Sequence, residues 1–89
     1  MGMKPVNNGY STRQQVEEYK KKYKVGTRIR LINMINEKSY QAGDTGTVKH
    51  VDDMGQIHMS WDGKGSLALI PGVDEFEIIS EGADINETI

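Results

Sequence analysis

The sequence predicts a mainly β fold, a small and strongly bent antiparallel barrel of about five strands preceded by one α-helix. Three observations lead to this prediction. Apolar residues recur with a period of two in several short segments between residues 27 and 79, which is the period of strands with one buried face. Glycine-rich turns separate these segments. The chain has 89 residues, enough for one domain with a small core.

The helix is predicted over residues 12–23. Ser11 precedes Gln14 by three residues, the spacing of a capping box in which each side chain pairs with the other residue's backbone N–H. Lysines 20–22 lie near the predicted C-terminal end, where cations suit the helix dipole. Gly26 is a stop signal. One narrow apolar stripe follows the helix, formed by Val16, Tyr19 and Tyr23.

The first strand is predicted over residues 27–32. Ile29 and Leu31 share one face, while Arg28 and Arg30 share the other. Because one face of such a strand packs on the core, we expect the two arginines to project into solvent.

A long polar loop over residues 33–42 comes next, followed by a sharp turn at residues 43–47. The turn leads into a strand that carries Val48 and Val51. Their three-residue spacing breaks strict alternation and predicts a β-bulge.

The central hairpin is predicted from residues 56–61, a glycine-rich turn at residues 62–65 and a partner strand over residues 66–70. Its inward face carries Ile57, Met59 and Trp61, so the single tryptophan is expected to be a core residue. A last strand is predicted over residues 76–79.

The two ends of the chain lack apolar periodicity. Residues 1–10 are expected to be a flexible lead-in, and residues 80–89 an acidic flexible tail. The chain has no cysteine, and no apolar run reaches the roughly 18 residues that span a bilayer. We therefore expect a cytoplasmic protein that has no membrane partner.

Four stretches carry a resemblance to known proteins: GTRIRL at 26–31, GDTGTV at 43–48, WDGKGSL at 61–67 and PGVDEFEI at 71–78. They resemble the SH3-like barrels of the KOW type. The chain from Ser11 to Ile79 is also similar to an uncharacterised family of small phage and mobile-element proteins that carry a capped helix before such a barrel. The resemblance implies an SH3-like fold and a setting in a bacterial host cell, and it implies no chemistry.

Catalysis and metal binding find no support in the sequence. The two histidines, His50 and His58, fall on different predicted strands, and neither lies within a known catalytic signature. Their spacing from the acidic residues matches no zinc or calcium motif. The segment 43–47 lacks the lysine and the following helix of a phosphate-binding loop, so a turn is the better interpretation. We expect no enzyme activity, no cofactor and no metal.

A binding protein is the favoured hypothesis. Proteins of this size in phages often act stoichiometrically, and a small anionic ligand such as a cyclic dinucleotide needs cations for its phosphates and flat groups for its bases. Arg28 and Arg30 meet the first need from a strand. Sequestration of this kind would counter host defence, and a homo-oligomer would offset the thin core of one subunit. The candidate ligand-binding residues are Tyr10, Arg13, Arg28, Arg30, Tyr40 and His58.

Two alternatives stay open. The first is a KOW-like nucleic-acid-binding module, in which Tyr19 and Tyr23 would stack on bases and a basic cluster would contact phosphates. The net charge of −2 argues only against broad coating of DNA. The second is an inhibitor that binds a host defence protein directly. The basic cluster comprises Lys20, Lys21, Lys22, Lys24, Arg28 and Arg30.

Overall fold

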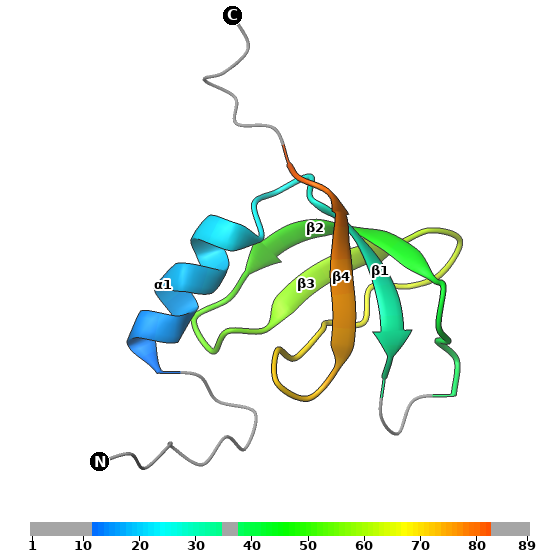
Figure 1. The fold of residues 1–89 in the computed structure, drawn as a ribbon, viewed down its shortest axis with the longest axis horizontal. Coiled ribbons are helices and arrows are strands. Elements are labelled where there is room, and N and C mark those ends of the chain that lie inside the picture. Colours follow the sequence, from blue (N-terminus) through cyan, green and yellow to red (C-terminus); the bar gives the residue numbers. More distant parts are fainter. Residues whose placement is uncertain (1–11, 35–37, 83–89) are drawn as a thin grey trace, which may run out of the picture.

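The protein has a mainly β fold with one helix, described by a computed structural model over residues 12–34 and 38–82. Four strands form one open antiparallel sheet in the order β3-β2-β1-β4, and α1 lies beside the end of β2 (Figure 1). Neither described segment contains a helix long and apolar enough to cross a membrane. The elements are α1 (Arg13–Lys22), β1 (Arg28–Asn33), β2 (Thr45–Val51), β3 (Ile57–Trp61) and β4 (Glu75–Ser80).

The capping box of α1 lies one residue later than the sequence predicted. The Thr12 hydroxyl accepts a hydrogen bond from the backbone N–H of Gln15 at 3.1 Å, and the Gln15 side chain accepts one from the backbone N–H of Thr12 at 2.9 Å. The prediction of Ser11 with Gln14 is therefore wrong, because the sequence STRQQ offers the same spacing twice and the helix uses the second pair. The helix is one residue shorter at each end than predicted.

The first predicted strand is confirmed, shifted by one residue. In β1, Ile29 and Leu31 are almost completely buried, whereas Arg30 is exposed and Arg28 is partly exposed. β1 pairs with β2 on one side and with β4 on the other. The arginines therefore project from a central strand, which is held along both edges.

The predicted bulge in β2 is confirmed. The pairing of β2 with β3 shifts between Val48 and His50, and both Lys49 and His50 face solvent before Val51 returns to the core. An extra residue of this kind lets two successive side chains point away from the core.

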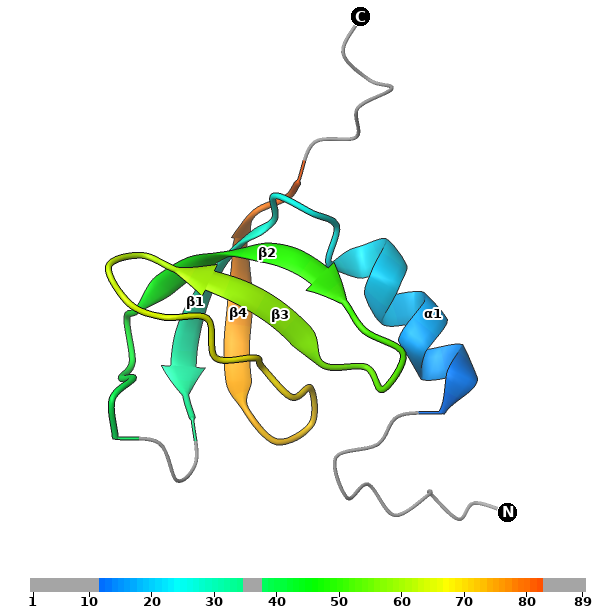
Figure 2. The same ribbon diagram turned by 180° about the vertical axis from the view of Figure 1, so that it is seen from behind.

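The structure has four strands, fewer than the five or so predicted, because residues 66–70 do not form a regular strand. This segment runs back beside β3 (Figure 2) but makes only an isolated bridge between Leu69 and Ile57. The indole Nε1–H of Trp61 donates a hydrogen bond to the carbonyl of Leu67 at 2.8 Å. That side-chain bond and the isolated bridge together hold the segment against β3.

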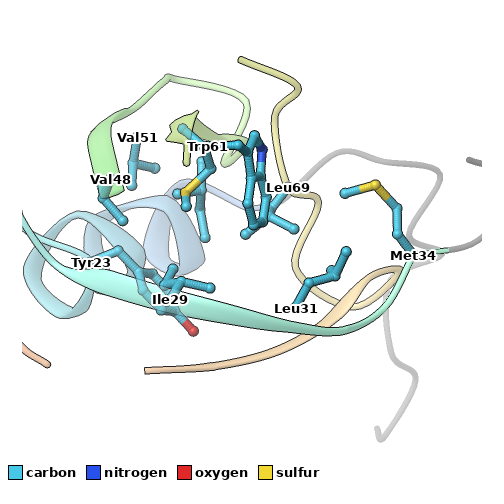
Figure 3. Packing of buried hydrophobic residues seen from close by; sticks show 10 residues of the cluster. Tyr23, Ile29, Leu31, Met34, Val48, Val51, Trp61 and Leu69 are labelled. Carbon is cyan, nitrogen blue, oxygen red and sulfur yellow. The ribbon is translucent and has the colours of Figure 1, made fainter. Parts of the chain in front are cut away.

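The core lies between the curved sheet, α1 and the segment before β4. Trp61 stands in its centre beside Leu69, with Ile29 and Leu31 approaching from β1 (Figure 3). The prediction that Ile57, Met59 and Trp61 share the inward face is confirmed. The buried cluster consists of Tyr23, Ile29, Leu31, Met34, Val48, Val51, Ile57, Met59, Trp61 and Leu69.

The predicted lead-in, residues 1–10, lies outside the described residues, as do residues 83–89 of the predicted tail. Ser80, the first residue of that tail, is the last residue of β4. The backbone N–H of Gly82 donates a hydrogen bond to the Thr27 hydroxyl at 3.1 Å, so the start of the predicted tail is attached to the residue before β1.

Candidate ligand-binding face

The outward side chains of three neighbouring strands form one polar surface. The strand register places Arg28 opposite Thr47, and Thr47 opposite Ser60, in a row across the sheet. A second row contains Arg30 and Thr45. All of these side chains are partly or fully exposed. We call this surface the outer sheet face, and it comprises Arg28, Arg30, Thr45, Thr47, His58 and Ser60.

Arg28 is held in a planar, two-bonded ion pair. Its Nη1 and Nη2 donate to the two carboxylate oxygens of Asp62 at 2.9 and 2.6 Å, and Nη1 also donates to the Thr47 hydroxyl at 2.9 Å. The Thr45 hydroxyl donates to the same carboxylate at 2.7 Å. The hydrogen bonds from Arg28, and then that from Thr45, hold the pKa of Asp62 well below its usual range. The Asp62 bond in turn raises the pKa of Arg28.

Arg30 is paired as well, with β4. Its Nε donates to Glu77 at 2.8 Å, and the two residues are register partners on β1 and β4. Both arginine pairs remain open to solvent: the side chains of Arg28 and Arg30 are 34% and 46% exposed. The two guanidinium groups thus stand at the surface, and each is oriented by a carboxylate.

His58 lies at the other end of the outer sheet face. Its Nε2 donates to the Asp52 carboxylate at 2.8 Å, and its ring stacks on that of His50. Burial alone would raise the pKa of Asp52, but the hydrogen bonds from His58 and from the backbone of Gln56 and Met54 outweigh it and lower that pKa.

The remaining candidates lie elsewhere. Tyr40 packs edge-on against Trp61, with ring centroids 5.4 Å apart, and the Lys64 ammonium lies 5.2 Å from the Tyr40 ring. Arg13 lines a surface hollow of about 500 Å³ beside α1, together with Glu17, Lys20, Val16 and Asp53. Tyr10 lies outside the described residues. The structure therefore gathers Arg28, Arg30 and His58 on one face and leaves Arg13 and Tyr40 apart from them.

The basic end of α1 gains a neighbour that the sequence analysis missed. The backbone N–H of Gly26 donates to the Val48 carbonyl at 2.9 Å, so the chain after α1 runs next to Lys49. Within residues 12–34 and 38–82, Lys21 and Lys49 form no salt bridge. Lys20 pairs with Asp53 at 3.0 Å.

The partners of the arginines and of His58 were also missed. Asp62, Thr45, Thr47 and Asp52 were assigned only to turns. Alternation places Thr45 and Thr47 on the outward face of β2, so the outward position of these two hydroxyl groups could have been predicted from the sequence. Asp52 and Asp62 lie outside the strands and Glu77 lies in β4, and no local spacing shows which cation each carboxylate reaches.

The described residues offer no metal centre, because no three His, Asp or Glu side chains among them come together as ligands. A second surface hollow, of about 380 Å³, lies beside β4. It is lined by Tyr23, Ile32, Pro71, Gly72, Asp74, Glu75 and Phe76. The outer sheet face itself is open and presents guanidinium and hydroxyl groups, which are groups that can donate hydrogen bonds to an anion.

Comparison with known proteins agrees with a small uncharacterised domain. No curated protein and no solved structure matches the chain. The model of a domain of unknown function, DUF4314, matches residues 12–79, which run from the N-cap of α1 into β4. The chain therefore belongs to the DUF4314 family.

Proposed function

We propose that this protein is a non-enzymatic binding module that sequesters a small anionic nucleotide, such as a cyclic dinucleotide, on the outer sheet face. The observation that supports it best is the pair Arg28 and Arg30, which project from alternate positions of the central strand β1. Alternate residues of a strand lie about 7 Å apart. Guanidinium groups bind phosphates through parallel hydrogen bonds, and a cyclic dinucleotide carries two phosphates.

The carboxylates of Asp62 and Glu77 set the conditions for such binding. They orient the two guanidinium groups in the free protein, which lowers the ordering cost when a ligand arrives. A bound phosphate must also displace these carboxylates from the guanidinium groups, or accept hydrogen bonds from the guanidinium groups alongside them. We therefore expect a ligand with two phosphates to bind much more tightly than a single phosphate.

An open face leaves a bound nucleotide exposed to water on one side. Small-molecule sites usually bury most of the ligand, so we propose that a second copy of the chain covers it in a homo-oligomer. The resemblance to small phage and mobile-element proteins supports a role in the bacterial cytoplasm, where such a module would remove a signal of host defence.

Isothermal titration of the intact protein with cyclic di-AMP and cyclic di-GMP tests the proposal, with light scattering to follow the oligomeric state. Arg28→Ala and Arg30→Ala should each weaken binding about tenfold or more, the scale of one charge-assisted hydrogen bond. Lys38→Ala removes an exposed cation elsewhere and should leave binding unchanged. Absence of binding, or equal affinity of all three variants and the wild type, would overturn the proposal.

Nucleic-acid binding is the second candidate, and the position of Lys49 favours it. Lys49 lies on the sheet next to the chain that follows α1, and the last turn of α1 carries Lys20, Lys21 and Lys22. A polyanion bound there would lose affinity steeply as salt is raised, and Lys21→Ala and Lys22→Ala would weaken it in similar steps. Fluorescence anisotropy with a labelled single-stranded oligonucleotide measures this. If neither ligand class binds, a host defence protein becomes the partner to seek.

A further inference from the structure

Two histidine rings are stacked at one end of the outer sheet face. His50 of β2 and His58 of β3 are register partners, their ring centroids are 4.3 Å apart, and their planes differ by 10°. His50 is exposed. A flat, exposed aromatic ring on a rigid sheet is the kind of surface on which nucleobases stack.

The turn after β2 fixes this pair in place. The Asp52 carboxylate accepts hydrogen bonds from the backbone N–H groups of Met54 and Gln56, each at 2.9 Å, and from His58 at 2.8 Å. These bonds hold the His58 ring, and His58 supports the His50 ring. The stacking surface is therefore ordered before any ligand arrives, which favours binding.

The bulge in β2 places a cation beside the exposed ring. Lys49 and His50 both face solvent because the register shifts between Val48 and His50. With strict alternation, only one of the two would point outward. Bulges often re-aim side chains at functional sites, and this one leaves two consecutive residues, a lysine and a histidine, exposed to solvent.

We infer that His50 is a nucleobase-stacking position, with His58 as its support and Lys49 as a contact for a ligand phosphate. This inference rests on the proposed function and extends it to the base of the ligand. Arg28 pairs with Thr47, and Lys49 lies two residues further along β2. The backbone positions of Arg28 and Lys49 are therefore about 7 Å apart along the strands and about 4.8 Å apart across them.

Titrations of the intact protein with three probes test the inference: a cyclic dinucleotide, the base-free anion ribose 5-phosphate, and a single-stranded oligonucleotide. His50→Ala should weaken binding of the base-containing probes at least about fivefold, the lower end for loss of one base-aromatic stack, and leave the base-free anion unchanged. His50→Phe keeps a flat ring and should restore most of the affinity. Thermal unfolding of each variant identifies any that fail to fold, and imidazole NMR signals of the wild type should shift with the base-containing probes alone.

The outcomes separate this inference from the proposed function. If Arg28→Ala weakens binding of the cyclic dinucleotide and His50→Ala does not, the stacking position is wrong and the proposed function stands. If only the oligonucleotide binds, and His50→Ala weakens it, the stacking position stands and sequestration of a small nucleotide is wrong. Equal losses for His50→Phe and His50→Ala would overturn stacking, and absence of binding by both base-containing probes would overturn both.

Discussion

Asp62, in the turn that follows β3, reaches across the sheet to hold Arg28 of β1 with both of its carboxylate oxygens, at 2.9 and 2.6 Å. The strand β2 lies between β1 and β3, and its Thr45 and Thr47 hydroxyl groups take part in the same network. The pair therefore links three strands. It also means that Asp62 competes with any anionic ligand for Arg28.

This competition gives the first prediction. Asp62→Asn removes the negative charge and should tighten binding of a cyclic dinucleotide several-fold, because the ligand then meets an uncompensated guanidinium group. Asp53→Asn makes the same change in net charge at an exposed position paired with Lys20. Titration calorimetry of both variants measures the effect. An equal gain in both would show that overall charge alone is responsible and that Arg28 has no specific role.

The second prediction concerns acid. The pKa of Asp62 is lowered by its bond from Arg28 and the pKa of Asp44 by its bond from Lys64, so both carboxylates hold protons less tightly in the folded chain. The stability they contribute is present above the unfolded pKa of about 3.9 and is lost as pH falls further, through the lowered folded values. Thermal unfolding should show a falling melting temperature below about pH 4.

Asp62→Asn provides the check on that profile. The amide cannot titrate, so the variant should be less stable at neutral pH and should lose less stability on acidification than the wild type. Asp53→Asn again controls for net charge. If the melting temperature of Asp62→Asn falls with pH as steeply as that of the wild type, the carboxylate of Asp62 contributes nothing to the acid response.

Most of the fold was predictable because it follows from periodicity. The alternation in β1 and β3 identified the buried faces, and the spacing of Val48 and Val51 identified the bulge. The errors occurred where the sequence offers two equivalent choices or where a strand-like segment does not pair regularly. The capping pair is repeated in STRQQ, and residues 66–70 contact β3 through an isolated bridge and a hydrogen bond from the Trp61 indole.

The candidate site was less predictable, because its contacts join residues that are distant in the sequence. Alternation showed that Arg28 and Arg30 point outward, yet their carboxylate partners lie 34 and 47 residues away. The stacking of His50 on His58 depends on the register of β2 and β3 after the bulge. Neither relationship has a local signal, and both required the strand pairing.

The third prediction concerns the core. Trp61 is 3% exposed, packs against Tyr40 and donates its indole N–H to the Leu67 carbonyl. Trp61→Ala should lower the free energy of unfolding by about 3–5 kcal/mol, the range for loss of a large buried aromatic side chain. Leu67→Ala keeps the carbonyl and removes only an exposed side chain, so it should cost much less. Urea unfolding compares them, and a Trp61→Ala midpoint equal to that of the wild type would contradict the inward position of Trp61.

The fourth prediction tests how closely β2 approaches β3. Gly46 lies opposite Trp61, and a Cβ atom there would come within 2.9 Å of both the Ser60 carbonyl oxygen and the Trp61 ring. The Ser60 carbonyl is backbone and cannot rotate away. Gly46→Ala should therefore push the two strands apart and lower the free energy of unfolding by about 1–3 kcal/mol, the usual cost of overpacking.

Gly65→Ala is the matched control for this substitution. The nearest atom to a Cβ at Gly65 is the Tyr40 hydroxyl oxygen at 3.4 Å, an ordinary contact, and the residue lies outside the left-handed region. Both variants reduce the conformational entropy of the unfolded chain equally, which by itself would stabilise the fold slightly. The difference between their free energies of unfolding in urea thus isolates the contact between β2 and β3. If Gly46→Ala is as stable as Gly65→Ala, the two strands do not approach as closely as the structure places them, and the outward positions of Thr45 and Thr47 would need to be revised with them.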